Sequence, residues 1–215
     1  MHPPCELCDE IEGGTTNSFH DRYGENLDSR IAGSSRNFVV MPSLGQIVPG
    51  YVIILPKRHE LSLARLSLNE LHELGDMVDH VRLMLDEHYS TPVLFEHGMK
   101  GVESNNGCGV YHAHLNAVPL VDSVDLIDVS RFRRISGLEG LLDFAETSYL
   151  YFADQRGSHF VKMIEKLPSQ WMRRALASAV GVQDWDWRHA GQEEELVETL
   201  RTMKRTWEDR SRIGE

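Results

Sequence analysis

Two histidines separated by one residue stand in the most chemically informative stretch of this chain, GCGVYHAHLNAVPL. Side chains of a β-strand alternate between its faces, so His112, His114 and Asn116 are expected to share one face. Gly107 and Gly109 allow a ligand to approach the backbone just before them. No aspartate or glutamate adjoins the pair to hold the imidazoles charged. This pattern indicates a site for a phosphate or a metal ion.

A second set of reactive residues, Cys5 and Cys8, stands near the N-terminus. Their C-x-x-C spacing places two thiolates within reach of one tetrahedral ion, and zinc would need two further ligands from elsewhere. Three cysteines in the whole chain fit metal binding in a reducing compartment better than a disulfide framework. The alternative is a pair of unligated thiols.

The elements that position these residues follow from the hydrophobic pattern. Two apolar runs, NFVVMP and YVIILP, are each closed by proline and predict a paired hairpin. Ser67 and Glu70 form a capping box that starts a long helix over 67–89, with apolar residues at helical spacing. PVLF and GVYHAHLNAVPL predict two more strands around a loop at 96–109, and 12–36 reads as loop with one short strand. The fold class is therefore α+β, an antiparallel sheet with one long helix on a face.

The segment after residue 120 predicts further elements. SYLYFADQRGSHFVKMI reads as a hairpin that turns at 155–157. LPSQWMRRALASAVG reads as a helix with Pro168 at its start and Gly181 at its end, and GQEEELVETLRTMKRTWEDR as a terminal helix. We interpret 1–120 as a nucleotide-processing core and 121–215 as an elaboration packed on that core.

Composition limits the possible partners. A chain of 215 residues with 41% hydrophobic content can bury a core of its own. Its formal net charge of −11 argues against binding nucleic acid or an anionic membrane, which both require basic surface. A small phosphorylated ligand remains possible, because backbone N–H groups can hold it locally. The start MHPPCELCDE lacks a signal-peptide pattern and no run is long enough to span a membrane, so we expect a cytoplasmic protein.

These motifs together resemble the histidine-triad (HIT) family of nucleotide-processing enzymes, whose signature is His-φ-His-φ-His-φ-φ with φ apolar. Residues 112–118 read HAHLNAV, so Asn116 stands in place of the third histidine, and Pro119 follows. The segments CELC and VPGYVIILPKRH and the helix after them extend the resemblance over roughly residues 5 to 120. His-x-His alone would be a weak signal, whereas the ordered set of motifs is a strong one.

The resemblance implies a mechanism and a metal. It assigns His114 as the nucleophile that attacks the α-phosphorus of a nucleotide and forms a nucleotidyl-histidine intermediate, with N–H groups around Gly107–Gly109 stabilising the oxyanion. It also implies that His59 and His112 join Cys5 and Cys8 as ligands of a structural Zn²⁺. Family members commonly pair through the long helix and an adjacent strand, so a homodimer is expected.

Departures from the family pattern bear on the reaction. Cys108 and Gly109 replace a Gln–Ser pair that contacts phosphate in many HIT hydrolases, and Ser43 falls where an acidic residue commonly binds the ribose. Family transferases and phosphorylases carry an amide at the position of Asn116. An amide can hydrogen-bond phosphate but cannot supply a proton at neutral pH. The resemblance thus points away from a generic purine phosphoramidase.

Weaker candidates surround this site. Glu96 and His97 end a strand beside the triad and could face the phosphates, or could be a solvated strand end. Asn106 could contact a ligand or merely shape a turn. Gln170 and Arg173, near the start of a predicted helix, could bind an anion or belong to an ordinary capped helix.

The leading hypothesis is an enzyme that hydrolyses or transfers a nucleoside monophosphate through His114, with Asn116 as the second catalytic candidate. Ser43, His97, Asn106 and residues 107–109 are the expected substrate contacts. The alternative is a nucleotide-binding module of the same fold with weak turnover. A third possibility, a catalytic zinc bound by His112 and His114, lacks a carboxylate partner and an evident open coordination position.

Overall fold

A computed structural model of the chain describes residues 5–102, 110–121, 126–191 and 193–213. The elements run in the order α1 (Glu6–Ile11), α2 (Ser18–Tyr23), β1 (Gly33–Ser34), β2 (Phe38–Pro42), β3 (Val52–Pro56), η1 (Leu63–Arg65), α3 (Leu68–His88), β4 (Pro92–Gly98), β5 (Leu115–Pro119), β6 (Arg133–Ile135), η2 (Leu138–Phe144), β7 (Tyr149–Ala153), β8 (His159–Met163), α4 (Trp171–Val180) and α5 (Glu193–Ile213).

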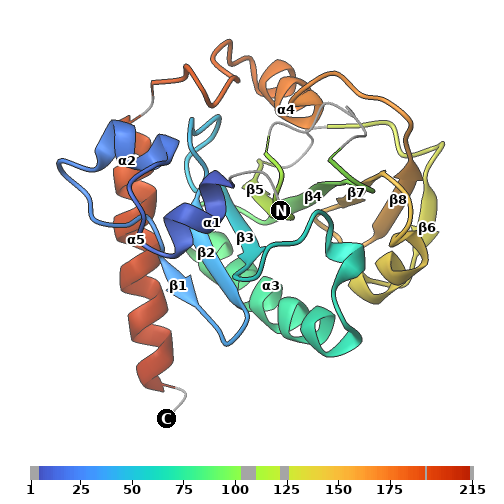
Figure 1. Cartoon of the computed structure of the whole chain (residues 1–215), viewed down its shortest axis with the longest axis horizontal. Helices are drawn as coiled ribbons and strands as arrows, with labels where there is room; N and C mark the ends of the chain where they lie inside the picture. Colours follow the sequence, from blue (N-terminus) through green and yellow to red (C-terminus); the bar gives the residue numbers. More distant parts are fainter. Residues whose placement is uncertain (1–4, 103–109, 122–125, 192, 214–215) are drawn as a thin grey trace.

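The strands form a single antiparallel sheet in the order β1-β2-β3-β5-β4-β7-β8-β6. The expected hairpin of β2 and β3 is present, with Val40 opposite Ile54. The expected second hairpin is present as β7 and β8, and β7 pairs with β4 so that the sheet continues from the first part of the chain into the second. Figure 1 shows β1 and β6 at opposite ends of this sheet. The α+β prediction is confirmed.

Strand alternation divides the core between the two faces of the sheet. On one face, even-numbered residues of β2 and β3 pack with the buried side of α3. The helix begins where the sequence predicts, because the Ser67 hydroxyl accepts from the Glu70 N–H and the Glu70 carboxylate accepts from the Ser67 N–H. Its contacts with η2 and α5 complete this layer.

The opposite face carries the other set of strand side chains, including Met41, Ile53 and Phe95, which pack with residues of α1 and α4. The helices on this face come from two separate parts of the chain, α1 and α2 from the N-terminus and α4 from the segment after residue 120 (Figure 1). This face contains the candidate site described below.

Four local predictions differ from the structure. Strand β4 runs to Gly98, so it includes the first three residues of the predicted loop 96–109. Helix α2 lies within the predicted loop 12–36, because the Asn17 side chain accepts from the His20 N–H and caps it. Helix α4 starts at Trp171, not at Pro168, because Gln170 adopts a left-handed conformation with φ 55. Strand β5 starts after His114, because the Ala113 N–H donates to the Glu60 carbonyl outside the sheet.

Among the described residues, no helix combines the length and the apolar character that crossing a membrane would require.

Candidate functional site

The four residues expected to bind metal come together at the N-terminal end of α1. Cys5, Cys8, His59 and His112 each offer one ligand atom, and these atoms all lie within 4.8 Å of one another. The Cys8 sulfur is 3.3 Å from His59 Nδ1 and 3.4 Å from His112 Nδ1. The Cys5 sulfur is also 3.4 Å from His112 Nδ1. The cluster could hold a metal ion.

Hydrogen bonding and burial prepare His112 to be a ligand. Its Nε2 donates to the Pro56 carbonyl at 2.8 Å, which leaves Nδ1 with its lone pair towards the two sulfur atoms. Burial, chiefly, lowers the pKa of His112 to about 4, so the ring is neutral at pH 7. Burial also raises the pKa of the Cys8 thiol to about 12, and neighbouring Cys5 adds to this effect. A cation among the four atoms would favour the thiolate.

A cavity of about 110 Å³ lies beside this cluster on the same face of the sheet. Four of its lining residues lie in strands: Ile53, Phe95, His97 and Asn116. Two more directly adjoin strands, Ser43 after β2 and His114 before β5. Helix α1 contributes Glu6, Leu7 and Glu10, and helix α4 contributes Trp171, Met172 and Arg173. The site therefore combines residues of segment 1–120 with residues of segment 121–215.

His114 is held in one tautomer inside this cavity. Its Nδ1 lies 2.7 Å from the His112 carbonyl oxygen, which can only accept, so Nδ1 carries the proton and Nε2 carries the lone pair. Burial lowers the pKa of His114, and the positive charges of Arg173 and Arg30 lower it further. A neutral imidazole with a free Nε2 lone pair is the form that a nucleophile requires.

Asn116 and Ser43 belong to a polar network that the strand pattern alone did not reveal. The Tyr51 hydroxyl donates to Asn116 Oδ1 at 2.6 Å, and Asn116 Nδ2 donates to the Phe95 carbonyl at 3.1 Å. The Ser43 hydroxyl accepts from Arg173 Nη1 at 3.0 Å. Tyr51 directly precedes β3 and stands two residues before Ile53. Strand alternation would therefore have placed the two side chains on the same face. Asn116 is therefore anchored by Tyr51 and Phe95.

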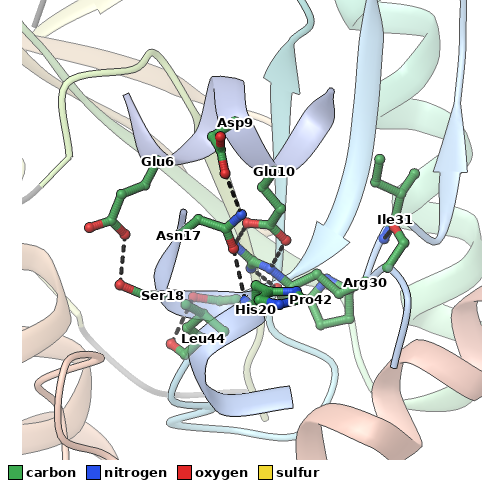
Figure 2. Close-up of polar contacts among 12 residues, drawn as sticks. Glu6, Asp9, Glu10, Asn17, Ser18, His20, Arg30, Ile31, Pro42 and Leu44 are labelled. Atoms are coloured by element: carbon green, nitrogen blue, oxygen red, sulfur yellow. Dashed lines mark hydrogen bonds and ion pairs between the residues drawn. The ribbon is translucent and has the colours of Figure 1, made fainter. Parts of the chain in front are cut away.

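A buried ion pair forms another wall of the cavity. Arg30 Nε and Nη2 donate to the two Glu10 carboxylate oxygens at 2.6 and 2.8 Å, and Nη1 donates to the Pro42 carbonyl (Figure 2). Asp9 on the same short helix accepts from the Asn17 side chain at 2.8 Å. These contacts attach α1, which carries the cysteines, to the strand and helix beside it. No pattern in the sequence indicates that Glu10 pairs with Arg30.

The adjacent residues Glu96 and His97 point to opposite faces of β4. His97 lines the cavity, and its Nε2 is buried with no partner among the described residues. Burial, with the charge of His114 adding to it, lowers the pKa of His97 to about 4. Glu96 does not face this cavity, because alternation turns it to the α3 side, where the Tyr149 hydroxyl and the Leu63 N–H donate to it. Asn106, Gly107, Cys108 and Gly109 lie outside the described residues.

Comparison with known proteins gives structural neighbours only, since no family model and no curated protein sequence matches this chain. One neighbour is a Hit-like protein involved in cell-cycle regulation from Bartonella henselae, 10% identical over 89% of this chain and 97% of that one, with a TM-score of 0.45. Another is a hypothetical histidine triad nucleotide-binding protein from Sulfolobus tokodaii, 12% identical over 95% and 93%, with a TM-score of 0.49. A Zn-bound histidine triad family protein from Mycobacterium smegmatis is 17% identical over 66% and 90%, with a TM-score of 0.42. The expected neighbours, histidine-triad proteins, are thus found, and at these identities the likeness concerns the fold alone.

Proposed function

We propose that this chain is a nucleotidyl hydrolase or transferase that acts at the α-phosphate of a nucleotide derivative through a nucleotidyl-His114 intermediate. The observation that carries the proposal is the hydrogen bond from His114 Nδ1 to the His112 carbonyl, which leaves a neutral Nε2 in the cavity. The motif HAHLNAV places this imidazole where the HIT resemblance puts the nucleophile.

The reaction would proceed in two displacements. His114 Nε2 attacks the α-phosphorus, the N–P bond forms, and the bond from phosphorus to the leaving oxygen breaks with its electron pair on the leaving group. Water, which loses a proton to the solvent, or inorganic phosphate then attacks the same phosphorus, and the N–P bond breaks with its electron pair returning to Nε2. Throughout, Nδ1 keeps its proton and donates it in the hydrogen bond to the His112 carbonyl, so that the imidazolium character of the intermediate is stabilised.

We also propose that the metal cluster holds a structural Zn²⁺. A tetrahedral zinc with bonds of about 2.3 Å to sulfur and about 2.0 Å to nitrogen has edges of about 3.5 Å between its ligand atoms. Three of the four sulfur–nitrogen pairs, at 3.3 and 3.4 Å, match that edge, and all four ligand atoms lie within 4.8 Å of one another. Four protein ligands close the coordination sphere, as in a structural site. His114 is not in this cluster and keeps its own role.

The alternative function, nucleotide binding with weak turnover, is favoured by one observation. Asn116 occupies the position of the third histidine, and its amide already binds Tyr51 and the Phe95 carbonyl, so it is less available to a leaving group. The two hypotheses both predict nucleotide binding and differ only in whether the protein turns the nucleotide over.

A panel of nucleoside diphosphates, dinucleotides and nucleotide sugars, incubated with and without inorganic phosphate and followed by phosphorus NMR, tests the proposal. His114→Asn should lower kcat by at least about 10³-fold while changing the ligand Kd by less than about threefold, because the side chain acts in bond formation. His72→Asn, whose side chain is 55% exposed, is the control variant. Wild-type protein quenched in base should carry the nucleotidyl mass on His114. Full activity in His114→Asn would refute the covalent mechanism, and binding without any turnover would favour the alternative.

A further inference from the structure

Helix α4 delivers a buried arginine to the cavity that contains His114. Gln170, with its positive φ, turns the chain into the helix, and Arg173 follows in the first turn. Arg173 is only 8% exposed and lines the same cavity as His114, Ser43 and Asn116. The arginine comes from the segment after residue 120, which lies outside the part of the chain that resembles the HIT family.

The contacts of Arg173 are with neutral groups. Nε donates to the Trp185 carbonyl at 2.9 Å, Nη1 to the Ser43 hydroxyl at 3.0 Å and Nη2 to the Gly45 carbonyl at 2.5 Å. The guanidinium carbon lies 5.3 Å from the centre of the Tyr51 ring. No ion pair joins Arg173 to a carboxylate within the described parts of the chain.

Arg30 in the same cavity provides the comparison. It is 2% exposed and both oxygens of the Glu10 carboxylate neutralise it. Arg173 is almost as buried and has no such partner, although burying a charge is costly unless it is paired. The hydrogen bonds to Trp185, Ser43 and Gly45 use three of the five guanidinium N–H groups, and the Tyr51 hydroxyl is a further neutral partner, so at least one N–H remains for a ligand.

The rest of the cavity suits an anion near Arg173. His97 Nε2 is buried without a partner among the described residues and can donate a hydrogen bond to a phosphate oxygen. Glu6 is an acidic residue that also lines the cavity. It is exposed, and its carboxylate accepts from the Ser18 hydroxyl (Figure 2). A guanidinium fork matches the geometry of phosphate oxygens in a bidentate contact.

We propose that Arg173 binds the phosphate of the substrate beside His114, so that the C-terminal segment supplies the cation of the active site. The proposal rests on the proposed function for the identity of the phosphate as that of a nucleotide. Arg173 would supply the positive charge that favours phosphate-bearing ligands over neutral nucleosides, in a chain whose net charge is −11. The segment 121–215 then contributes directly to ligand recognition.

Calorimetric titration of the full chain tests this assignment. The probes are inorganic pyrophosphate, the 5′-monophosphates of adenosine, guanosine, cytidine and uridine, and the four free nucleosides. Arg173→Gln should weaken binding of pyrophosphate and of each bound monophosphate by about 10- to 100-fold, because a charge-assisted hydrogen bond is lost. Nucleoside affinity should change by less than about twofold. Arg174→Gln is the matched control, since Arg174 is the exposed neighbour on the same helix.

Arg173→Lys retains the charge without the fork and is the second variant, for use also if Arg173→Gln does not fold. It should weaken pyrophosphate binding by at least about fivefold. Equal affinities in wild type and Arg173→Lys, equal effects of Arg173→Gln and Arg174→Gln, or no binding of any phosphate probe to the wild type would each overturn the proposal.

The two proposals fail separately. His114→Asn should retain pyrophosphate binding, because it leaves Arg173 in place. Phosphate binding that depends on Arg173 in a protein without turnover would overturn the proposed enzyme function and support the anion site. Turnover by wild type with an unchanged kcat/KM in Arg173→Gln would overturn the anion site and leave the enzyme function standing.

Discussion

The ion pair of Glu10 and Arg30 is expected to dominate the stability of the N-terminal helix. The two side chains are 5% and 2% exposed, and both carboxylate oxygens bind the guanidinium. Glu10→Gln preserves the size of the side chain and removes its charge, which leaves Arg30 buried without a counter-charge. Breaking such a pair costs about 3–5 kcal/mol in the free energy of unfolding. For a chain of this size the corresponding fall in Tm is about 6–20 °C.

Thermal and urea unfolding of wild type, Glu10→Gln and Glu12→Gln measures this effect. Glu12 is exposed and directly follows the same helix, so its variant controls for loss of a negative charge in this region. Arg30→Met combined with Glu10→Gln should recover part of the lost stability, because an apolar replacement removes the unpaired charge. A cost below about 1 kcal/mol for Glu10→Gln, typical of a surface pair, would refute the reasoning.

Three further predictions concern the metal, a buried acid and the assembly. Purified protein should contain about one zinc per chain, and a chelator or Cys8→Ser should lower Tm; metal-free protein prepared without chelator, or an unchanged Tm, would contradict this. Burial raises the pKa of Glu96 to about 8, so the folded state retains this proton and stability should fall as pH rises from about 4.5 to about 8. Glu96→Gln should reduce this change of stability with pH, measured by urea unfolding at several pH values. If the variant shows the same pH dependence as the wild type, other groups cause it. Light scattering should give a dimer mass, and a monomer mass at all concentrations would disprove the homodimer.

Local patterns in the sequence predicted the elements whose signals are short-range. Alternating and apolar runs located β2, β3, β7 and β8, and the Ser67–Glu70 capping box located the start of α3. Those signals depend on neighbours within one turn or one strand, so they can be read without the fold. Helix α2 was missed because its six residues are too few for a helical period to stand out, and its cap at Asn17 lies in a polar stretch.

The sequence by itself also predicted the candidate metal ligands and a candidate nucleophile. Cys5 and Cys8 follow from their C-x-x-C spacing, and the resemblance to the HIT family implies His59, His112 and His114. Only the tertiary structure decided what surrounds them. Arg173 and Ser43 are 130 residues apart, Tyr51 and Asn116 are 65 apart, and no local pattern indicates which of these pairs will meet. Their contacts follow from strand order and from the docking of α4 over the sheet, since long-range contacts form only when the elements pack.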